Sequence, residues 1–215
     1  MRIRVKICGL RTAEDVAFAA DAGASYVGLV FYPRSPRFLT VDAAREAALG
    51  APAGVAKVGL VVNASDADLD AILARVPLDM LQLQGQETPA RVAEVRVRYG
   101  LPVMKAFGIG DLADLAQIGG FAGVADQVLV DAKPPRDGLP GGNGTSFDWG
   151  LIAGYRWPLP WLLAGGLTET TVAEAIRLTG ATQVDVSSGV ESAPGVKDRG
   201  RIAGFIRAAG GMAQR

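Results

Sequence analysis

Residues 4–31, RVKICGLRTAEDVAFAADAGASYVGLVF, contain two apolar runs with a helical pattern between them. Residues 4–7 are rich in β-branched side chains and predict a strand. Thr12 then precedes an acidic pair and an apolar stripe at helical spacing, so we predict a helix that Thr12 caps and that Gly23 ends. Residues 26–31 predict a second strand. Two strands joined by such a helix predict a right-handed crossover and parallel pairing.

The same alternation continues along the chain, which predicts a single-domain (β/α)₈ TIM barrel of the α/β class over residues 1–215. The alternative is an open doubly wound sheet. Against it, Cys8-Gly9-Leu10 stands where a G-x-G-x-x-G motif would follow the first strand. The later predicted elements are helix 41–49, strand 55–62, helix 66–74, strand 80–83, helix 91–98, strand 103–107, helix 111–117, strand 127–130, helix 148–153, strand 161–164, helix 168–179, strand 183–186 and helix 199–209.

Composition narrows the partners and the chemistry. The 22 Lys and Arg residues balance 22 Asp and Glu residues without long runs of one charge, so we expect no nucleic-acid partner. The apolar runs are too short to span a bilayer, and the N-terminal residues lack the apolar region of a signal peptide. We therefore expect a cytoplasmic protein with no membrane partner. One cysteine and no histidine argue against a disulfide and a metal site, and leave proton transfer to Cys, Asp, Glu, Lys or Tyr.

Three polar residues fall where a barrel places its functional groups, on the loops after the carboxyl ends of the strands. Cys8 ends the first predicted strand, Arg37 lies in the loop after the second, and Asp131 follows the sixth. Loops 32–40 and 132–147 are long and rich in glycine, proline and basic residues, which suits segments that close over a ligand. The sequence therefore predicts one functional site around these residues.

Small residues follow the seventh and eighth predicted strands, at Gly165-Gly166 and Ser187-Ser188-Gly189. Small side chains allow backbone N–H groups to approach a phosphate closely, and a helix N-terminus adds about half a positive charge. Barrels frequently bind phosphate at this position. We predict a phosphate site there, with tight turns alone as the alternative explanation of the glycines.

Seven segments resemble phosphoribosylanthranilate isomerase and occur in that family's order, from residue 3 to about residue 205. The resemblance implies a TIM barrel that performs an Amadori rearrangement of N-(5′-phosphoribosyl)anthranilate to 1-(o-carboxyphenylamino)-1-deoxyribulose 5-phosphate in tryptophan biosynthesis. It also implies that the isomerase needs no metal or organic cofactor. The segments are KICG at 6–9, FY with SPR at 31–37, LQLQG at 81–85, VD at 130–131, SFDW at 146–149, AGGL at 164–167 and VDVSSGVE at 184–191.

The resemblance implies an acid and a base on opposite sides of the sugar. Asp131 matches the general acid, which protonates the furanose ring oxygen, and Cys8 matches the general base, which removes the C2′ proton. Burial is expected to keep Asp131 protonated near neutrality. Lys6 lies about 6.6 Å from Cys8 along the same strand face, so we expect its charge to favour the thiolate.

Other positions match ligand contacts of the family. Arg37 is implied to face the anthranilate carboxylate and Asp185 to contact substrate, while a solvated loop arginine and a structural aspartate are the alternatives from the residues alone. Gln84 stands where the family usually has histidine, so it can keep a substrate hydrogen bond but cannot carry a proton. Loop 141–145 lacks the lysine often found there, which removes one positive charge.

Three other functions are alternatives to phosphoribosylanthranilate isomerisation. A histidine-pathway or dual-substrate sugar isomerase would carry a carboxylate at the end of the first strand, where this chain has Cys8. A phosphate-ligand binding barrel without catalysis would need neither Cys8 nor Asp131, and a lyase or synthase of the same pathway is the third possibility. The expected partner is a phosphorylated aminosugar, and the expected assembly is a monomer or a homodimer.

Overall fold

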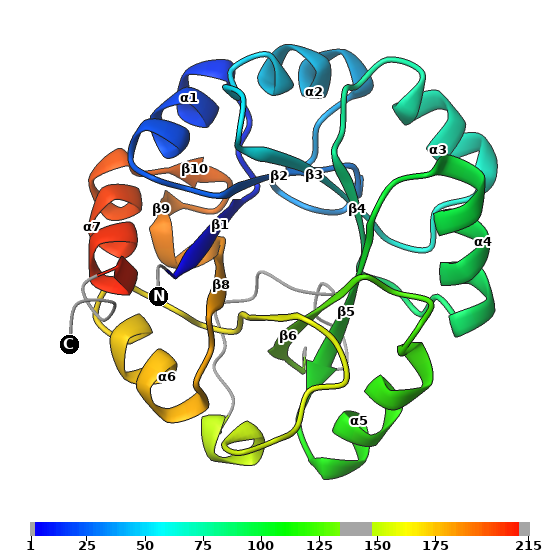
Figure 1. The fold of residues 1–215 in the computed structure, drawn as a ribbon. Coiled ribbons are helices and arrows are strands. Elements are labelled where there is room, and N and C mark those ends of the chain that lie inside the picture. Colours follow the sequence, from blue (N-terminus) through cyan, green and yellow to red (C-terminus); the bar gives the residue numbers. More distant parts are fainter. Residues whose placement is uncertain (1–2, 134–147, 211–215) are drawn as a thin grey trace.

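The computed structural model describes residues 3–133 and 148–210. Within these residues, eight strands form a closed parallel barrel: β1 (Arg4–Cys8), β2 (Tyr26–Val30), β3 (Ala56–Val61), β4 (Met80–Leu83), β5 (Val103–Ile109), β6 (Gln127–Ala132), β7 (Trp161–Leu163) and β8 (Gln183–Val186). Strand β1 pairs with both β2 and β8, which completes the ring (Figure 1). The predicted barrel is confirmed, and the open sheet is excluded.

Helices surround the barrel on its outside (Figure 1). The cap expected at Thr12 is present and Ser65 caps another helix in the same way, since each hydroxyl accepts a hydrogen bond from the backbone N–H three residues later. Gly100 and Gly180 follow their helices in the left-handed conformation that glycine adopts without strain. The helices are α1 (Ala13–Asp21), α2 (Val41–Ala48), α3 (Asp66–Leu73), α4 (Pro89–Tyr99), α5 (Leu112–Ala116), α6 (Val172–Thr179) and α7 (Arg199–Gly210), with 3₁₀ helices η1 (Gln117–Phe121), η2 (Trp149–Ile152) and η3 (Ser188–Val190).

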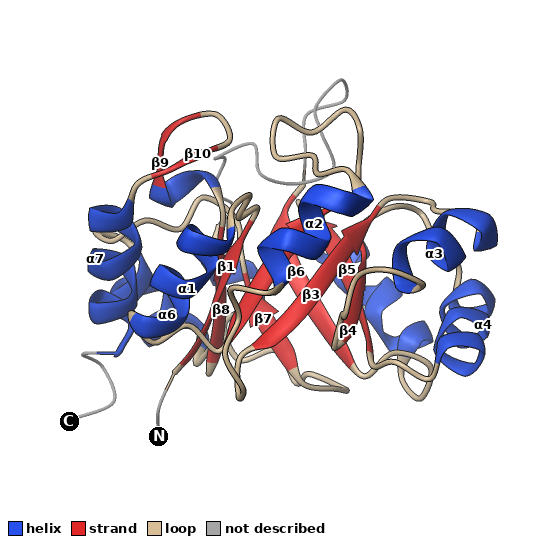
Figure 2. Ribbon diagram, turned by 90° about the horizontal axis from the view of Figure 1, so that it is seen from above, coloured by secondary structure: helices blue, strands red, loops and turns tan. Residues whose placement is uncertain are grey.

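Two predicted elements differ from the structure, and one structural element was not predicted. The helix expected over 148–153 is the 3₁₀ helix η2, whose first turn is closed by a 2.8 Å hydrogen bond from the Gly150 N–H to Asp148. The helix expected from residue 168 begins at Val172, because residues 168–171 form a turn with hydrogen-bonded threonine side chains. The sequence also gave no prediction of the antiparallel hairpin β9 (Glu191–Ala193) and β10 (Val196–Lys197), which Figure 2 shows at the end of the barrel where the strands terminate.

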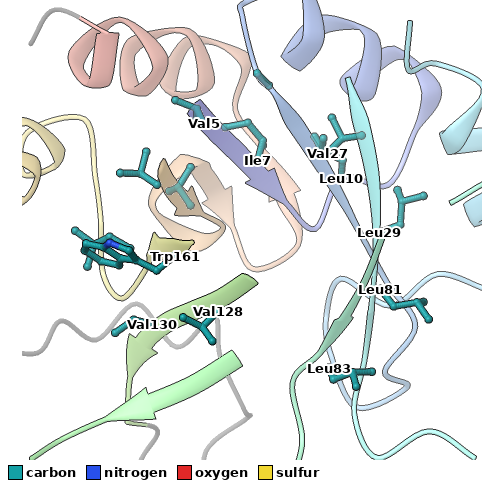
Figure 3. Packing of buried hydrophobic residues seen from close by; sticks show 14 of the residues in the cluster. Val5, Ile7, Leu10, Val27, Leu29, Leu81, Leu83, Val128, Val130 and Trp161 are labelled. Carbon is teal, nitrogen blue, oxygen red and sulfur yellow. The ribbon is translucent and has the colours of Figure 1, made fainter. Parts of the chain in front are cut away.

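Successive strand residues separate into two cores because side chains alternate between the two faces of a strand. Inward-facing residues fill the barrel interior, and outward-facing residues pack against the helices. Figure 3 shows Leu29, Leu81 and Trp161 of the outer core directed away from the centre of the ring. The interior cluster consists of Tyr26, Val58, Met80, Met104, Ala106, Leu129, Leu162 and Ala164.

The outer core contains residues from Val5 to Ala209 and thus draws on nearly the whole of the described chain. Above the apolar interior, the same inward face carries the buried polar side chains of Lys6, Gln82 and Asp185. Apolar side chains therefore fill the interior of the barrel, and polar groups lie near the carboxyl ends of its strands. Among the described residues, every helix is too short or too polar to cross a membrane.

Candidate active site

A pocket lies at the carboxyl end of the barrel and contains about 500 Å³ of space that opens to solvent. It brings together five predicted site residues from distant parts of the chain, namely Cys8, Arg37, Gln84, Asp131 and Asp185. A smaller adjoining space of about 300 Å³ is lined by all five residues of the predicted phosphate site, Gly165, Gly166, Ser187, Ser188 and Gly189. Asp131, Asp185 and Ser187 line both spaces, so the two form one continuous site.

Cys8 ends β1 and is buried beside Lys6, whose side chain lies on the same inward face. Gly28 on β2 makes room for both groups, because a Cβ atom there would lie 2.9 Å from Cys8 Sγ and 3.2 Å from Lys6 Nζ. The Lys6 ammonium donates a 2.8 Å hydrogen bond to Asp185 Oδ1 on β8. A thiol, an ammonium and a carboxylate therefore form one buried cluster across β1, β2 and β8.

Burial dominates the titration of Cys8. It raises the pKa of the thiol; Lys6 and Lys197 act in the opposite direction, and Asp185 adds to the rise. Lys6 therefore favours the thiolate as expected, while desolvation outweighs its charge and leaves the pKa of the thiol raised. Although burial opposes the Lys6 charge, Asp185 and Cys8 raise the pKa of this ammonium, so it stays protonated.

Asp131 lies near the end of β6 and is half-buried. Burial, with a further contribution from the nearby Asp185 carboxylate, raises the pKa of its carboxyl to about 7, while a 2.8 Å hydrogen bond from the Ala132 N–H and the charge of Lys6 oppose the rise. The direction agrees with the expectation from the sequence. A substantial fraction of this carboxyl is protonated near neutral pH, as a proton donor requires.

Arg37 is buried, with an exposed fraction of 5%, which excludes a solvated loop residue. Its Nε and Nη2 donate to the two oxygens of Glu191 at 2.7 and 2.8 Å. Gly9 permits this placement, because its φ is +79° and a Cβ atom there would lie 2.4 Å from the Arg37 side chain. Sequence reasoning did not select Glu191 as a functional residue, and its separation of 154 residues from Arg37 left no local signal.

The loops after β7 and β8 lie in close contact with each other. Gly165 and Gly166 both adopt positive φ values, 86° and 63°. A Cβ atom at Gly189 would lie 2.0 Å from the Leu167 carbonyl oxygen, so a larger residue would separate the two loops. The Ser187 hydroxyl donates to the Cys8 carbonyl oxygen at 3.1 Å, which ties the β8 loop to the end of β1.

Gln82 is a further pocket residue that sequence reasoning missed. Its side chain is buried, and its Nε2 donates a 2.6 Å hydrogen bond to Gln84 Oε1. Gln82 Oε1 has no hydrogen-bond partner among the described residues. Gln84 therefore orients the amide of Gln82 on the β4 side of the pocket.

Several other polar and aromatic residues lie away from the pocket. Asp126 accepts a hydrogen bond from the Val103 N–H at 2.8 Å, at the amino end of β5. Trp157 stacks on Trp161 with ring centroids 4.1 Å apart, and Trp149 also packs against the outer core. The glycine loop 141–145 and the first half of the SFDW segment lie outside the described residues.

Comparison with known protein families shows to which family the chain belongs. The model of the family described as N-(5'phosphoribosyl)anthranilate (PRA) isomerase matches residues 5–208. The chain belongs to this family. A relative from Cereibacter sphaeroides named N-(5'-phosphoribosyl)anthranilate isomerase is 66% identical over 96% of this chain and 98% of its own length. One of the same name from Paracoccus denitrificans is 63% identical over 96% of each chain.

Solved structures of phosphoribosylanthranilate isomerases share the fold. The enzyme from Thermotoga maritima aligns with a TM-score of 0.88 at 36% identity, over 97% of this chain and 99% of the other. A phosphoribosylanthranilate isomerase in complex with reduced 1-(o-carboxyphenylamino)-1-deoxyribulose 5-phosphate aligns with a TM-score of 0.85 at 34% identity, over the same shares of the two chains. The resemblance noted in the sequence is thus confirmed at the level of the phosphoribosylanthranilate isomerase family.

Gln84 provides a test of the one pocket position where this chain departs from the histidine expected in a phosphoribosylanthranilate isomerase. Gln84→His should keep kcat/KM within about fivefold, because a neutral imidazole also accepts a hydrogen bond from Gln82 Nε2. Gln84→Leu should lower kcat/KM about tenfold, since leaving a buried amide unsatisfied costs about 1–3 kcal/mol. Steady-state kinetics of both variants beside Gln86→Leu, whose side chain is exposed, measures this; equal rates for the leucine and histidine variants would contradict it.

Proposed function

We propose that this chain isomerises N-(5′-phosphoribosyl)anthranilate to 1-(o-carboxyphenylamino)-1-deoxyribulose 5-phosphate in tryptophan biosynthesis. The observation that carries the proposal is the presence of Cys8 and Asp131 in one pocket that adjoins the small-residue loops after β7 and β8. The solved relative that binds the reduced product supports a phosphorylated aminosugar ligand of this class.

The pocket offers a different environment to each part of the proposed substrate. The phosphate suits the space around Gly165, Gly166 and 187–189, where backbone N–H groups can approach it. The carboxylate suits the positive charge of the Arg37 guanidinium, which lines the pocket while Glu191 accepts from its Nε and Nη2. Between these ends lies an apolar wall for the aromatic ring, made of Val30, Leu60, Val62 and Leu129.

In the proposed reaction the two ionisable residues exchange protons with the sugar. Asp131 donates its proton to the furanose ring oxygen, the C1′–O bond breaks, and the nitrogen lone pair forms the protonated Schiff base. The Cys8 thiolate then removes the C2′ proton, and the electron pair of that bond neutralises the iminium to give an enolamine. Tautomerisation moves the enol proton to C1′ and yields the ketone. The substrate gains and loses no electrons overall, and solvent exchange restores the two protonation states.

The pKa values predict the pH dependence of kcat/KM, which reports ionisations of the free enzyme. The working form needs Asp131 protonated, with a pKa of about 7, and Cys8 ionised, with a pKa that burial raises. Because the acid has the lower pKa, this form is a minor species, so kcat/KM should rise as pH increases to about 7, stay level, and fall only at alkaline pH, above the raised pKa of Cys8. A profile from pH 5.5 to 10 measures this. Activity that falls as pH rises through 7 would contradict the assignment.

Turnover of purified N-(5′-phosphoribosyl)anthranilate tests the function itself, and loss of anthranilate fluorescence follows the reaction. We expect saturable isomerisation of this substrate and at least 100-fold lower kcat/KM, about the discrimination that a polar binding site provides, on the aminosugar phosphate of the histidine pathway. A preference for the latter would favour the related sugar isomerase. Binding without turnover would favour a non-catalytic barrel.

We place the enzyme in the cytoplasm, with its phosphorylated substrate as the small-molecule partner. The Thermotoga maritima relative is described as dimeric and has also been studied as generated monomers. Both a monomer and a homodimer therefore agree with what is known of the family. Sedimentation of the purified chain would decide between the two.

A further inference from the structure

Glu191 has no part in the proposed chemistry, yet it is one of the most completely paired side chains near the pocket. It is 6% exposed and accepts hydrogen bonds from Arg37 and from Lys197 Nζ at 2.7 Å, while the Gly195 N–H lies 3.2 Å from its second oxygen. Although burial opposes its charge, Arg37 and Lys197 hold the pKa of this carboxyl below its usual range. Glu191 is therefore a buried carboxylate shared by two cations.

Lys197 connects Glu191 to Ser187, at the end of the site where a phosphate is predicted to bind. Its side chain is almost fully buried, and its Nζ donates to the Ser187 carbonyl oxygen at 2.9 Å and lies 3.4 Å from the Ser187 hydroxyl. Ser187 lines both the main pocket and the space of the predicted phosphate site. A chain of buried contacts thus runs from Arg37 through Glu191 and Lys197 to Ser187.

The β9–β10 hairpin supplies Glu191 and Lys197, the two middle residues of this chain of contacts. It packs against the loop that carries Arg37. At its turn, Gly195 has a φ of +79°, and a Cβ atom there would lie 2.5 Å from the Pro36 carbonyl oxygen. The Arg201 side chain also donates to the Glu191 carbonyl oxygen. The hairpin is therefore fixed both to the β2 loop and to helix α7.

The charges of this cluster favour an anionic ligand. Arg37 and Lys197 supply two positive charges and Glu191 one negative charge, which leaves one positive charge in a buried setting where charges act strongly. A freely rotating arginine would lose side-chain entropy on binding a carboxylate, whereas an arginine already held by Glu191 loses less. Glu191 can therefore improve binding without contacting the ligand.

We propose that Glu191 is a positioning residue that holds Arg37 and the Lys197–Ser187 contact together, so that the site recognises a carboxylate and a phosphate on one ligand. This inference rests on the proposed function, which assigns these two groups to the two ends of the site. It adds the role of the hairpin: the residues after β8 align the carboxylate end as well as the phosphate end.

A ligand-truncation experiment tests the inference. The probes are the reduced product analogue, its form without the carboxylate and its form without the phosphate, each titrated by calorimetry into the wild type, Glu191→Gln and Lys197→Met. Glu174→Gln is the matched control, because Glu174 is exposed and pairs with Arg177 at the surface. Steady-state KM and kcat are measured for the same proteins.

In the wild type, removal of either acidic group should weaken binding about 10- to 100-fold, the equivalent of one charge-assisted hydrogen bond. In Glu191→Gln, this loss of affinity on removing the carboxylate or the phosphate (the carboxylate penalty and the phosphate penalty) should fall to about threefold or less. KM should rise about 10- to 100-fold, with a much smaller change in kcat. Lys197→Met should reduce only the phosphate penalty, because the Arg37–Glu191 pair remains. Glu174→Gln should match the wild type.

Other outcomes separate the possible failures. If Glu191→Gln weakens all three ligands by one common factor, or leaves both penalties unchanged, Glu191 has only a structural role and the inference is wrong. If Glu191→Gln does not fold, Lys197→Met provides the test. An unchanged phosphate penalty in that variant would overturn the proposed link from Glu191 through Lys197 to Ser187. A wild type with neither turnover nor a penalty for either group would instead refute the proposed function.

Discussion

Replacement of Cys8 by alanine is expected to lower kcat by a factor of about 10²–10⁴, which is the usual contribution of a positioned proton acceptor. Within the described part of the pocket, the other acidic or basic side chains are already engaged as ion-pair partners or as the proposed acid. These side chains are therefore not expected to take over removal of the C2′ proton. KM should change little, because the thiol contributes to the transition state more than to ground-state binding.

Single-turnover and steady-state measurements on Cys8→Ala would measure this effect, with the melting temperature as the control for folding. Cys8→Ser gives a matched comparison that preserves the shape of the side chain and is also expected to be impaired, because a hydroxyl ionises far less readily than a thiol. Cys8 is the only cysteine of the chain, so alkylation of the wild type reports on this residue alone. Near-normal turnover of a folded alanine variant would rule out Cys8 as the base.

Asp131→Asn is expected to lower kcat by a similar factor of about 10²–10⁴, because the amide cannot protonate the ring oxygen. The same change should stabilise the fold at alkaline pH. The pKa of Asp131 rises from an ordinary 3.8 to about 7 on folding, so the folded state holds its proton more tightly and loses stability as pH rises through this range. The upper limit of this loss is about 4 kcal/mol.

Denaturant unfolding at pH 5 and pH 8.5 would measure the stability of Asp131→Asn against the wild type. The advantage of asparagine should grow between these two pH values, since the wild-type carboxyl ionises between them. A variant that is inactive and equally or less stable at pH 8.5 would show that the carboxyl is not held in its protonated form. Loss of activity together with a gain of stability is the expected signature of an acid kept for catalysis.

The barrel could be predicted from the sequence because every strand carries a local signal. Strands such as β2 and β4 read as short, buried apolar runs, and caps such as Thr12 and Ser65 mark where the helices begin. The β9–β10 hairpin carries no such signal, because its strands are only three and two residues long. Its stability comes from the buried Glu191 and its partners, which are tertiary contacts.

The positions of Cys8, Arg37 and Asp131 around one pocket followed from topology, since the carboxyl ends of all barrel strands meet at one edge. The partners of these residues did not follow, because contacts such as Arg37 with Glu191 join loops that are far apart in sequence. The effect of Lys6 on the pKa of Cys8 was predicted, but the larger effect of burial was not. A lysine two positions away is visible in a sequence, whereas the depth of burial is set by the whole barrel.

The ion pair between Lys6 and Asp185 joins the first strand to the last, across 179 residues. The two strands that complete the ring are therefore the two that supply the buried charges beside the thiol. A nascent or truncated chain that lacks β8 would be inert however much of the barrel it had assembled. Catalytic competence would then appear only with the final strand, and an activity assay during refolding would report completion of the barrel rather than its early collapse.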